Sequence, residues 1–145
     1  MRSAGGCRTA LIMILIAGSS ELAHAAAPSY YDGVAIGTVT AAEINEASGI
    51  VASRQNPGVL WTHNDTGYPG SVFALSTNGT LLGRYSVPNA FFGDYEDISF
   101  GPGPNPEHQY IYLGDIGDNY ASRASIRVFR FPEPAVYLYQ SNNPP

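Results

Sequence analysis

The feature that most constrains the fold of this sequence is a succession of short apolar runs, each ended by a turn signal before a helix could develop. After residue 25, no window repeats its apolar residues with the period of about 3.6 positions that marks an amphipathic helix. Asn78-Gly79, between two apolar runs, is a strong hairpin signal. The pattern predicts an all-β chain whose strand segments are 49–53, 59–63, 71–76, 80–87, 97–100, 110–114, 126–131 and 136–140.

The first 25 residues have the pattern of a secretory signal peptide. Arg2 and Arg8 precede an uncharged apolar run at 10–18, and small residues follow at 23–27. The apolar run is shorter than the roughly 20 residues that a membrane-spanning helix needs. The pattern predicts cleavage after Ala25, a secreted (extracellular or periplasmic) protein, and no membrane attachment after cleavage. Residues 26–45 are expected to form a polar lead-in to a folded domain at 46–145.

The composition of residues 26–145 excludes several classes of function. The chain's single cysteine, Cys7, lies in the predicted signal peptide, so the remainder can form no disulfide, thiol nucleophile or cysteine-ligated zinc site. Residues 26–145 hold five arginines, no lysine and eleven acidic residues, a net charge of −6. Nucleic-acid binding requires a basic surface to neutralise phosphates, so a nucleic-acid partner is not expected.

The predicted strands form two similar sets. Segments 48–53, 60–63 and 73–75 align with 96–101, 112–115 and 129–131, in the same order. A four-stranded antiparallel unit that repeats every 40 to 50 residues or so is typical of a β-propeller blade, with blade one at about 46–88 and blade two at about 94–140. The alternative is a small β-sandwich.

Two blades are fewer than the four or more of a typical propeller. We therefore expect the chain to be the N-terminal part of a longer protein, whose remaining blades would be its partners. Self-association of partial propellers is the alternative, because the outermost strands would otherwise present unpaired edges.

Acidic patches occur at corresponding places in both predicted blades: 63–65, 94–97 and 115–119. In a blade, the loop that enters the first strand lies on the same face as the loop between the second and third strands, so the three patches are expected to meet. Carboxylate and amide oxygens are the ligands that Ca²⁺ prefers. The sequence predicts Ca²⁺ as a cofactor, with the ligands Glu96, Asp97, Asp115, Asp118 and Asn119.

A catalytic role is the second hypothesis for the same rim. His63 and Asp65 are the candidates for general acid or base beside the metal. The simpler alternatives are that His63 is a hydrogen-bonded structural residue, and that Asp118 and Asn119 cap their own turn.

Several motifs resemble those of a known group of proteins: S-G-I-V-A-S-R, N-P-G-V-L-W-T-H-N-D-T-G, D-Y-E-D-I, Y-I-Y-L-G-D-I-G-D-N and R-V-F-R-F-P-E-P. They look like the opening blades of secreted phytase-like or esterase-like β-propeller proteins. The resemblance implies a secreted propeller with a calcium-binding acidic channel mouth, and phosphoesterase activity in some members. This chain departs from phytase-type propellers because it has no lysines, and few arginines, to hold substrate phosphates.

Two functions follow from these observations. The first is a secreted β-propeller module with an acidic, calcium-binding rim and a non-catalytic binding or structural role. The second is a calcium-dependent hydrolase of phosphate or carboxylic esters. No G-x-S-x-G nucleophile motif occurs in the sequence, which favours the first.

Overall fold

The computed structural model describes residues 28–67 and 69–137. The predicted signal peptide, 1–25, lies outside the described residues. Residues 28–33 form a separate unit without helix or strand, and residues 34–137 contain the strands described below. The described residues form no helix, and so none that could cross a membrane. The expected all-β class is confirmed.

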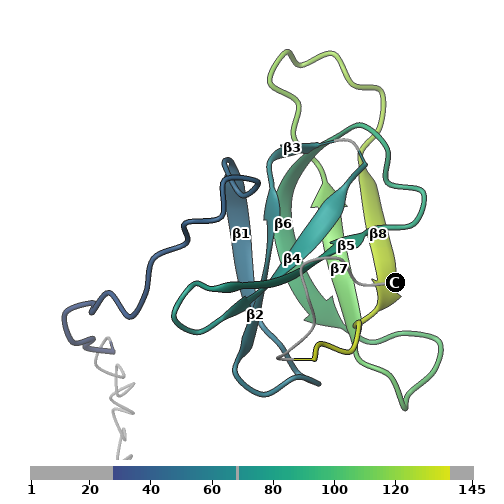
Figure 1. Ribbon diagram of the computed structural model, residues 1–145. Coiled ribbons are helices and arrows are strands. Elements are labelled where there is room, and N and C mark those ends of the chain that lie inside the picture. The colour runs from purple at the N-terminus through teal and green to yellow at the C-terminus, as the bar shows by residue number, and fades with distance from the viewer. Residues whose placement is uncertain (1–27, 68, 138–145) are drawn as a thin grey trace, which may run out of the picture. The chain divides into compact units, whose positions relative to one another are not determined.

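The first sheet is an antiparallel meander in the order β1-β2-β4-β5 (Figure 1). Its strands are β1 (Ala47–Ala52), β2 (Val59–Asn64), β4 (Ser71–Ser76) and β5 (Leu81–Ser86). The predicted hairpin joins β4 to β5: Gly79 has a φ of 90°, and the backbone N–H of Gly79 donates to the Ser76 carbonyl. Asn-Gly supplies this turn because glycine adopts a positive φ without steric cost.

The second sheet has the order β3-β6-β7-β8 and is also antiparallel. Its strands are β3 (Thr66–Gly67), β6 (Gly93–Gly101), β7 (Tyr110–Asp115) and β8 (Arg127–Pro132). The sequence did not predict β3, which lies in the connection between β2 and β4 and pairs with the start of β6. The predicted strand at 136–140 is not observed at 136–137, and 138–140 lies outside the described residues.

The two sheets repeat the same plan, with small offsets. Val51, Trp61 and Ala74 lie side by side in the first sheet, and Ile98, Leu113 and Phe129 do so in the second. The equivalent strands β1 and β6 each carry a bulge near the acidic end of their sheet, at Ser48 in β1 and at Glu96 in β6. When the two sheets are superposed on these bulges, the predicted alignment holds for β1 with β6 and for β4 with β8, and it differs by one residue for β2 with β7.

The core lies between the two sheets, where β1 and β2 contact β6. Trp61 is fully buried, and Tyr85 meets it edge to face with ring centroids 5.3 Å apart. The remaining buried apolar residues of this cluster come from both sheets: Val59, Val72, Ala74, Val87, Ala90, Tyr95, Ile98, Ile111, Leu113 and Phe131. The sheets do not close into a ring (Figure 1), an arrangement compatible with two neighbouring propeller blades or with a small β-sandwich.

A short segment after β8, Glu133–Val136, ties the second sheet to the first, and we call it the strap. The buried Glu133 carboxylate accepts hydrogen bonds from Trp61 Nε1 (2.8 Å), from Asn56 Nδ2 (3.1 Å) and from the Ser53 hydroxyl. The Val136 N–H donates to Asn56 Oδ1 at 2.8 Å. The only tryptophan of the chain therefore reports on a contact between residues more than 70 positions apart.

Candidate functional site

The acidic patches meet at one end of the two sheets. Asp65 follows β2, Asp94 and Glu96 lie at the start of β6, and Asp115 ends β7. Backbone hydrogen bonds fix this arrangement, because the Tyr95 N–H donates to the Asp65 carbonyl at 2.6 Å and the Gly117 N–H donates to the Asp94 carbonyl at 3.1 Å. The β3–β6 pairing thus holds the end of the first sheet against the start of β6.

Three carboxylates converge here: Asp65, Asp94 and Glu96, which we call the carboxylate corner. Each offers one oxygen, and these oxygens lie within 4.8 Å of one another. Asp65 Oδ1 and Asp94 Oδ1 are buried and have no hydrogen-bond partner among the described residues. Burial, the adjoining Asp94 carboxylate and the negative charges of Glu96 and Glu46 raise the pKa of Asp65. The corner concentrates negative charge, which the Arg123 guanidinium offsets in part through its electrostatic interaction with Asp94.

Asp115, a predicted calcium ligand, has other partners. Its side chain is fully buried and forms ion pairs with Arg123 (2.7 Å) and Arg127 (2.6 Å). It also accepts a hydrogen bond from the Asp94 N–H at 3.0 Å. Burial alone would raise the pKa of Asp115, but the hydrogen bonds from Arg123, the Asp94 N–H and Arg127 lower it. Asp115 therefore anchors the two arginines and the start of β6.

Asp118 caps the turn that follows β7. Its carboxylate accepts hydrogen bonds from the N–H groups of Ser122 (2.9 Å) and Arg123 (3.0 Å), the arrangement that the turn-capping alternative describes. The Asn119 amide reaches the corner and donates to Asp94 Oδ2 at 3.4 Å. A Cβ at Gly117 would lie 2.3 Å from Cγ of Asp94, so glycine is needed for this loop to pass so close to the carboxylate.

The Asp97 carboxylate accepts a hydrogen bond from the N–H of Ile98, the next residue, at 2.8 Å. Its side chain is exposed, and Asp97 is not one of the three residues of the corner. Of the five predicted metal ligands, the structure therefore places Glu96 in the corner and Asn119 in contact with it.

His63, a predicted catalytic residue, is fully buried in β2. Its Nδ1 lies 3.0 Å from the Asn64 carbonyl oxygen, and its Nε2 has no partner among the described residues. Burial lowers the pKa of His63, although the Asn64 carbonyl and the charges of Asp97 and Asp65 oppose the shift. A Cβ at Gly49 would lie only 2.8 Å from His63 Nε2, so β1 closes over the ring.

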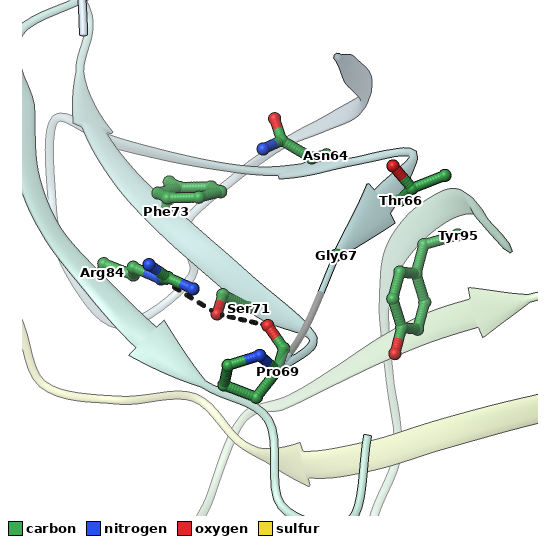
Figure 2. A pocket seen from close by; sticks show the side chains of 8 residues that line it. All are labelled: Asn64, Thr66, Gly67, Pro69, Ser71, Phe73, Arg84 and Tyr95. Atoms are coloured by element: carbon green, nitrogen blue, oxygen red, sulfur yellow. Dashed lines mark hydrogen bonds between the residues drawn. The ribbon is translucent and has the colours of Figure 1, made fainter. Parts of the chain in front are cut away.

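A small pocket lies beside β3, lined by residues that include Asn64, Thr66 and Tyr95 (Figure 2). In Figure 2, Arg84 Nε donates to the Ser71 hydroxyl (3.1 Å), which in turn donates to the Pro69 carbonyl (3.0 Å). The pocket holds about 30 Å³, far less than the roughly 300 Å³ of a small-molecule site. It is too small for an ester substrate.

Sequence reasoning assigned Asp65 to catalysis and did not include Asp94 among the metal ligands. Asp94 lies in the acidic patch at 94–97, but strand alternation was expected to start only at residue 97. The bulge at Glu96 changes which side chains face the core. Asp94 could have been identified only by predicting β3, because the pairing of Thr66 with Asp94 brings Asp94 next to Asp65.

Comparison of the chain with protein-family models, with curated proteins and with solved structures returns no match.

Proposed function

We propose that this chain is a secreted, non-catalytic β-sheet module that binds Ca²⁺ at the carboxylate corner, where the ion joins the two sheets. The observation that carries the proposal is the convergence of Asp65, Asp94 and Glu96, whose oxygens lie within 4.8 Å of one another. Like charges at this distance repel one another strongly unless a cation compensates them.

The chemistry of the donors supports calcium among the common cations. Asp65, Asp94 and Glu96 supply only hard carboxylate oxygens, and the Asn119 amide group lies beside them. Ca²⁺ accepts six to eight oxygens in flexible geometry, whereas zinc prefers nitrogen and sulfur ligands in a tetrahedron. The buried His63 ring is not a member of the cluster.

The position of the corner supports a structural role for the ion. Asp65 belongs to the connection that leaves the first sheet, whereas Asp94 and Glu96 belong to β6 of the second. Directly after Asp65 comes β3, a strand of only two residues that pairs with the start of β6. A cation bound by all three side chains would hold this short ladder closed and keep the sheets in register.

No arrangement of side chains within residues 28–67 and 69–137 favours the hydrolase hypothesis. His63 lies fully buried beneath Gly49, so its ring has no access to a substrate. The Asp115 carboxylate is paired with two arginines and is not available as a base. The pocket beside the corner is too small for an ester. We therefore propose the non-catalytic function alone.

Calcium titration calorimetry and thermal unfolding of the full chain test the proposal. Ca²⁺ should raise the melting temperature, because an ion that binds only the folded state stabilises it by about 2.7 kcal/mol at roughly 100 times its Kd. Glu96→Gln should remove most of this increase. Glu107→Gln is the matched control, because Glu107 is also exposed and lies in the loop after β6. Absence of calorimetric binding, or an equal loss in both variants, would overturn the proposal.

A further inference from the structure

The two sheets differ at their outer edges. In the first sheet, β5 covers the outer edge of β4, with Val72 opposite Tyr85 and Phe73 opposite Arg84. In the second sheet, β8 occupies the place of β4, and among the described residues it pairs only with β7. The second sheet instead gains its fourth strand, β3, at the opposite edge. One row of β8 backbone groups therefore faces away from the sheet.

A groove runs along this open edge. Five consecutive residues of β8, from Val128 to Pro132, line it on one side, and Val87, Pro88 and Asn89 line it on the other. A cavity that touches five successive residues of a strand must follow the edge, because side chains alternate between the faces of a sheet. Its volume of about 360 Å³ lies within the range of ligand sites.

The edge strand is held firmly while its outer groups stay accessible. Phe131 is buried in the core, and Phe129 packs against it with its ring centroid 6.3 Å from that of Tyr95. Val128 remains 60% exposed, and Arg130 is exposed as well. Such an edge can accept another strand with little loss of its own conformational freedom.

The charge of the edge indicates which strand it would accept. Arg130 stacks over the Tyr110 ring at 5.9 Å and has no ion-pair partner within residues 28–67 and 69–137. Arg127, at the start of β8, is half-exposed beyond its ion pair with Asp115. Residues 26–145 are acidic overall, so these two arginines make β8 an exception on this molecule. An incoming strand with acidic side chains would complement them.

We propose that the open edge of β8 binds an extended acidic segment of a partner protein, which adds to the second sheet as an antiparallel strand in the position that β5 has in the first. Backbone hydrogen bonds along β8 supply the affinity, and the apolar groove receives alternate side chains. Pairing of a carboxylate with Arg130 sets the preference for acidic partners. This interaction does not require the carboxylate corner or its ion.

Fluorescence anisotropy on the full chain tests the proposal with a labelled nonapeptide in which valine alternates with glutamate. We expect binding by the wild-type chain and a roughly fivefold higher Kd for Arg130→Glu, the upper end of the effect that one exposed charge pair supplies. A peptide in which valine alternates with lysine should bind Arg130→Glu more tightly than it binds the wild-type chain. A glutamate peptide with proline at its centre should bind neither protein, because proline cannot complete the ladder.

Arg54→Glu is the matched control, because Arg54 is also exposed and stacks over an aromatic ring, Phe100, at 5.3 Å. It should leave the Kd unchanged. Equal effects of the two substitutions, tolerance of the central proline, or no binding by the wild-type chain would overturn the proposal. So would a dimer, detected by light scattering, whose formation the Arg130→Glu change abolishes, because a second copy would then be the occupant.

Discussion

At the scale of single residues, the two most buried carboxylates in the described part of the chain have different kinds of partner. Glu133 is surrounded by neutral donors, including Trp61 Nε1 at 2.8 Å, whereas Asp115 is held by the guanidinium groups of Arg123 and Arg127. Hydrogen bonds from either kind of donor stabilise a charged carboxylate, and a guanidinium group adds the attraction of its opposite charge. The two residues are therefore expected to respond to different perturbations.

Glu133→Gln should destabilise the chain by about 1–3 kcal/mol, because the amide oxygen can keep the three donors of Oε1 only if the NH₂ group faces the Gln55 N–H, which is then left unsatisfied. Chemical denaturation followed by tryptophan fluorescence measures this effect. The fluorescence emission maximum of Trp61 in the folded variant should also shift, because the indole N–H would then donate to a neutral amide in place of a charged carboxylate. Glu107→Gln should change neither quantity. An unchanged unfolding midpoint would show that the Glu133 carboxylate contributes nothing to stability.

Asp115 should make the stability of the chain sensitive to acid. Its pKa is lowered below the ordinary value of 3.8, so its contribution to stability is fully present above pH 3.8 and is lost as the pH falls through the folded pKa. Asp65 acts in the opposite direction, because its pKa is raised. The test therefore compares wild type with Asp115→Asn by urea denaturation between pH 6 and pH 3. The difference in unfolding free energy should shrink at low pH, and a constant difference would contradict this assignment.

At the scale of elements, the bulge in β6 determines which of its residues reach the core. Tyr95 and Ile98 are both buried although they are three positions apart, which regular alternation does not allow. The extra residue, Glu96, restores the pattern and leaves its own carboxylate in the corner. Glu96 therefore keeps Tyr95 and Ile98 facing the core and also contributes a carboxylate to the corner.

Deletion of Glu96 should abolish the folded state, because a slip of one residue moves either Tyr95 or Ile98 out of the core. Glu96→Gln keeps the residue count and should fold with its near-ultraviolet circular dichroism intact. Two-dimensional NMR of the two proteins distinguishes the outcomes. Dispersed amide resonances from the deletion variant would show that the bulge is dispensable.

The sequence predicted most of the strands and the meeting of the acidic patches, because these depend on apolar patterning and on antiparallel topology. It did not predict β3, since a strand of two residues has no periodicity to detect. It also placed the start of β6 at residue 97, because the bulge at Glu96 breaks the alternation that would have extended the strand to Gly93. The pairing of Asp115 with Arg123 and Arg127 depends on loop conformation, which local patterns do not specify.

At the scale of the whole molecule, the two sheets are joined by the shared core, by the strap at one end and by the β3–β6 ladder at the other. The strap is built from hydrogen bonds within the chain, whereas the ladder ends in three carboxylates that repel one another. The end of the molecule that carries the carboxylate corner is therefore the weaker connection, and the proposed ion would act there.

Removal of divalent ions should loosen this end selectively. In EDTA, hydrogen exchange measured by mass spectrometry should become faster at Tyr95 and other amides near β3, with little change in β2 and β7, the central strands. Addition of Ca²⁺ should restore protection. Asp94→Asn should exchange at the same rate with and without Ca²⁺. Uniform changes across the chain would indicate a global effect and would contradict a local role for the ion.

The strap has a consequence for the order in which the parts of the chain fold. Every strand of the first sheet lies between Ala47 and Ser86, so this sheet can pair before residue 133 becomes available to a chain that folds from its N-terminus. The indole N–H of Trp61, however, finds its acceptor only when residue 133 has been synthesised. Until then, the first sheet holds an indole N–H without its acceptor. The strap therefore completes the core in the last step of folding, and the fluorescence of Trp61 should report that step.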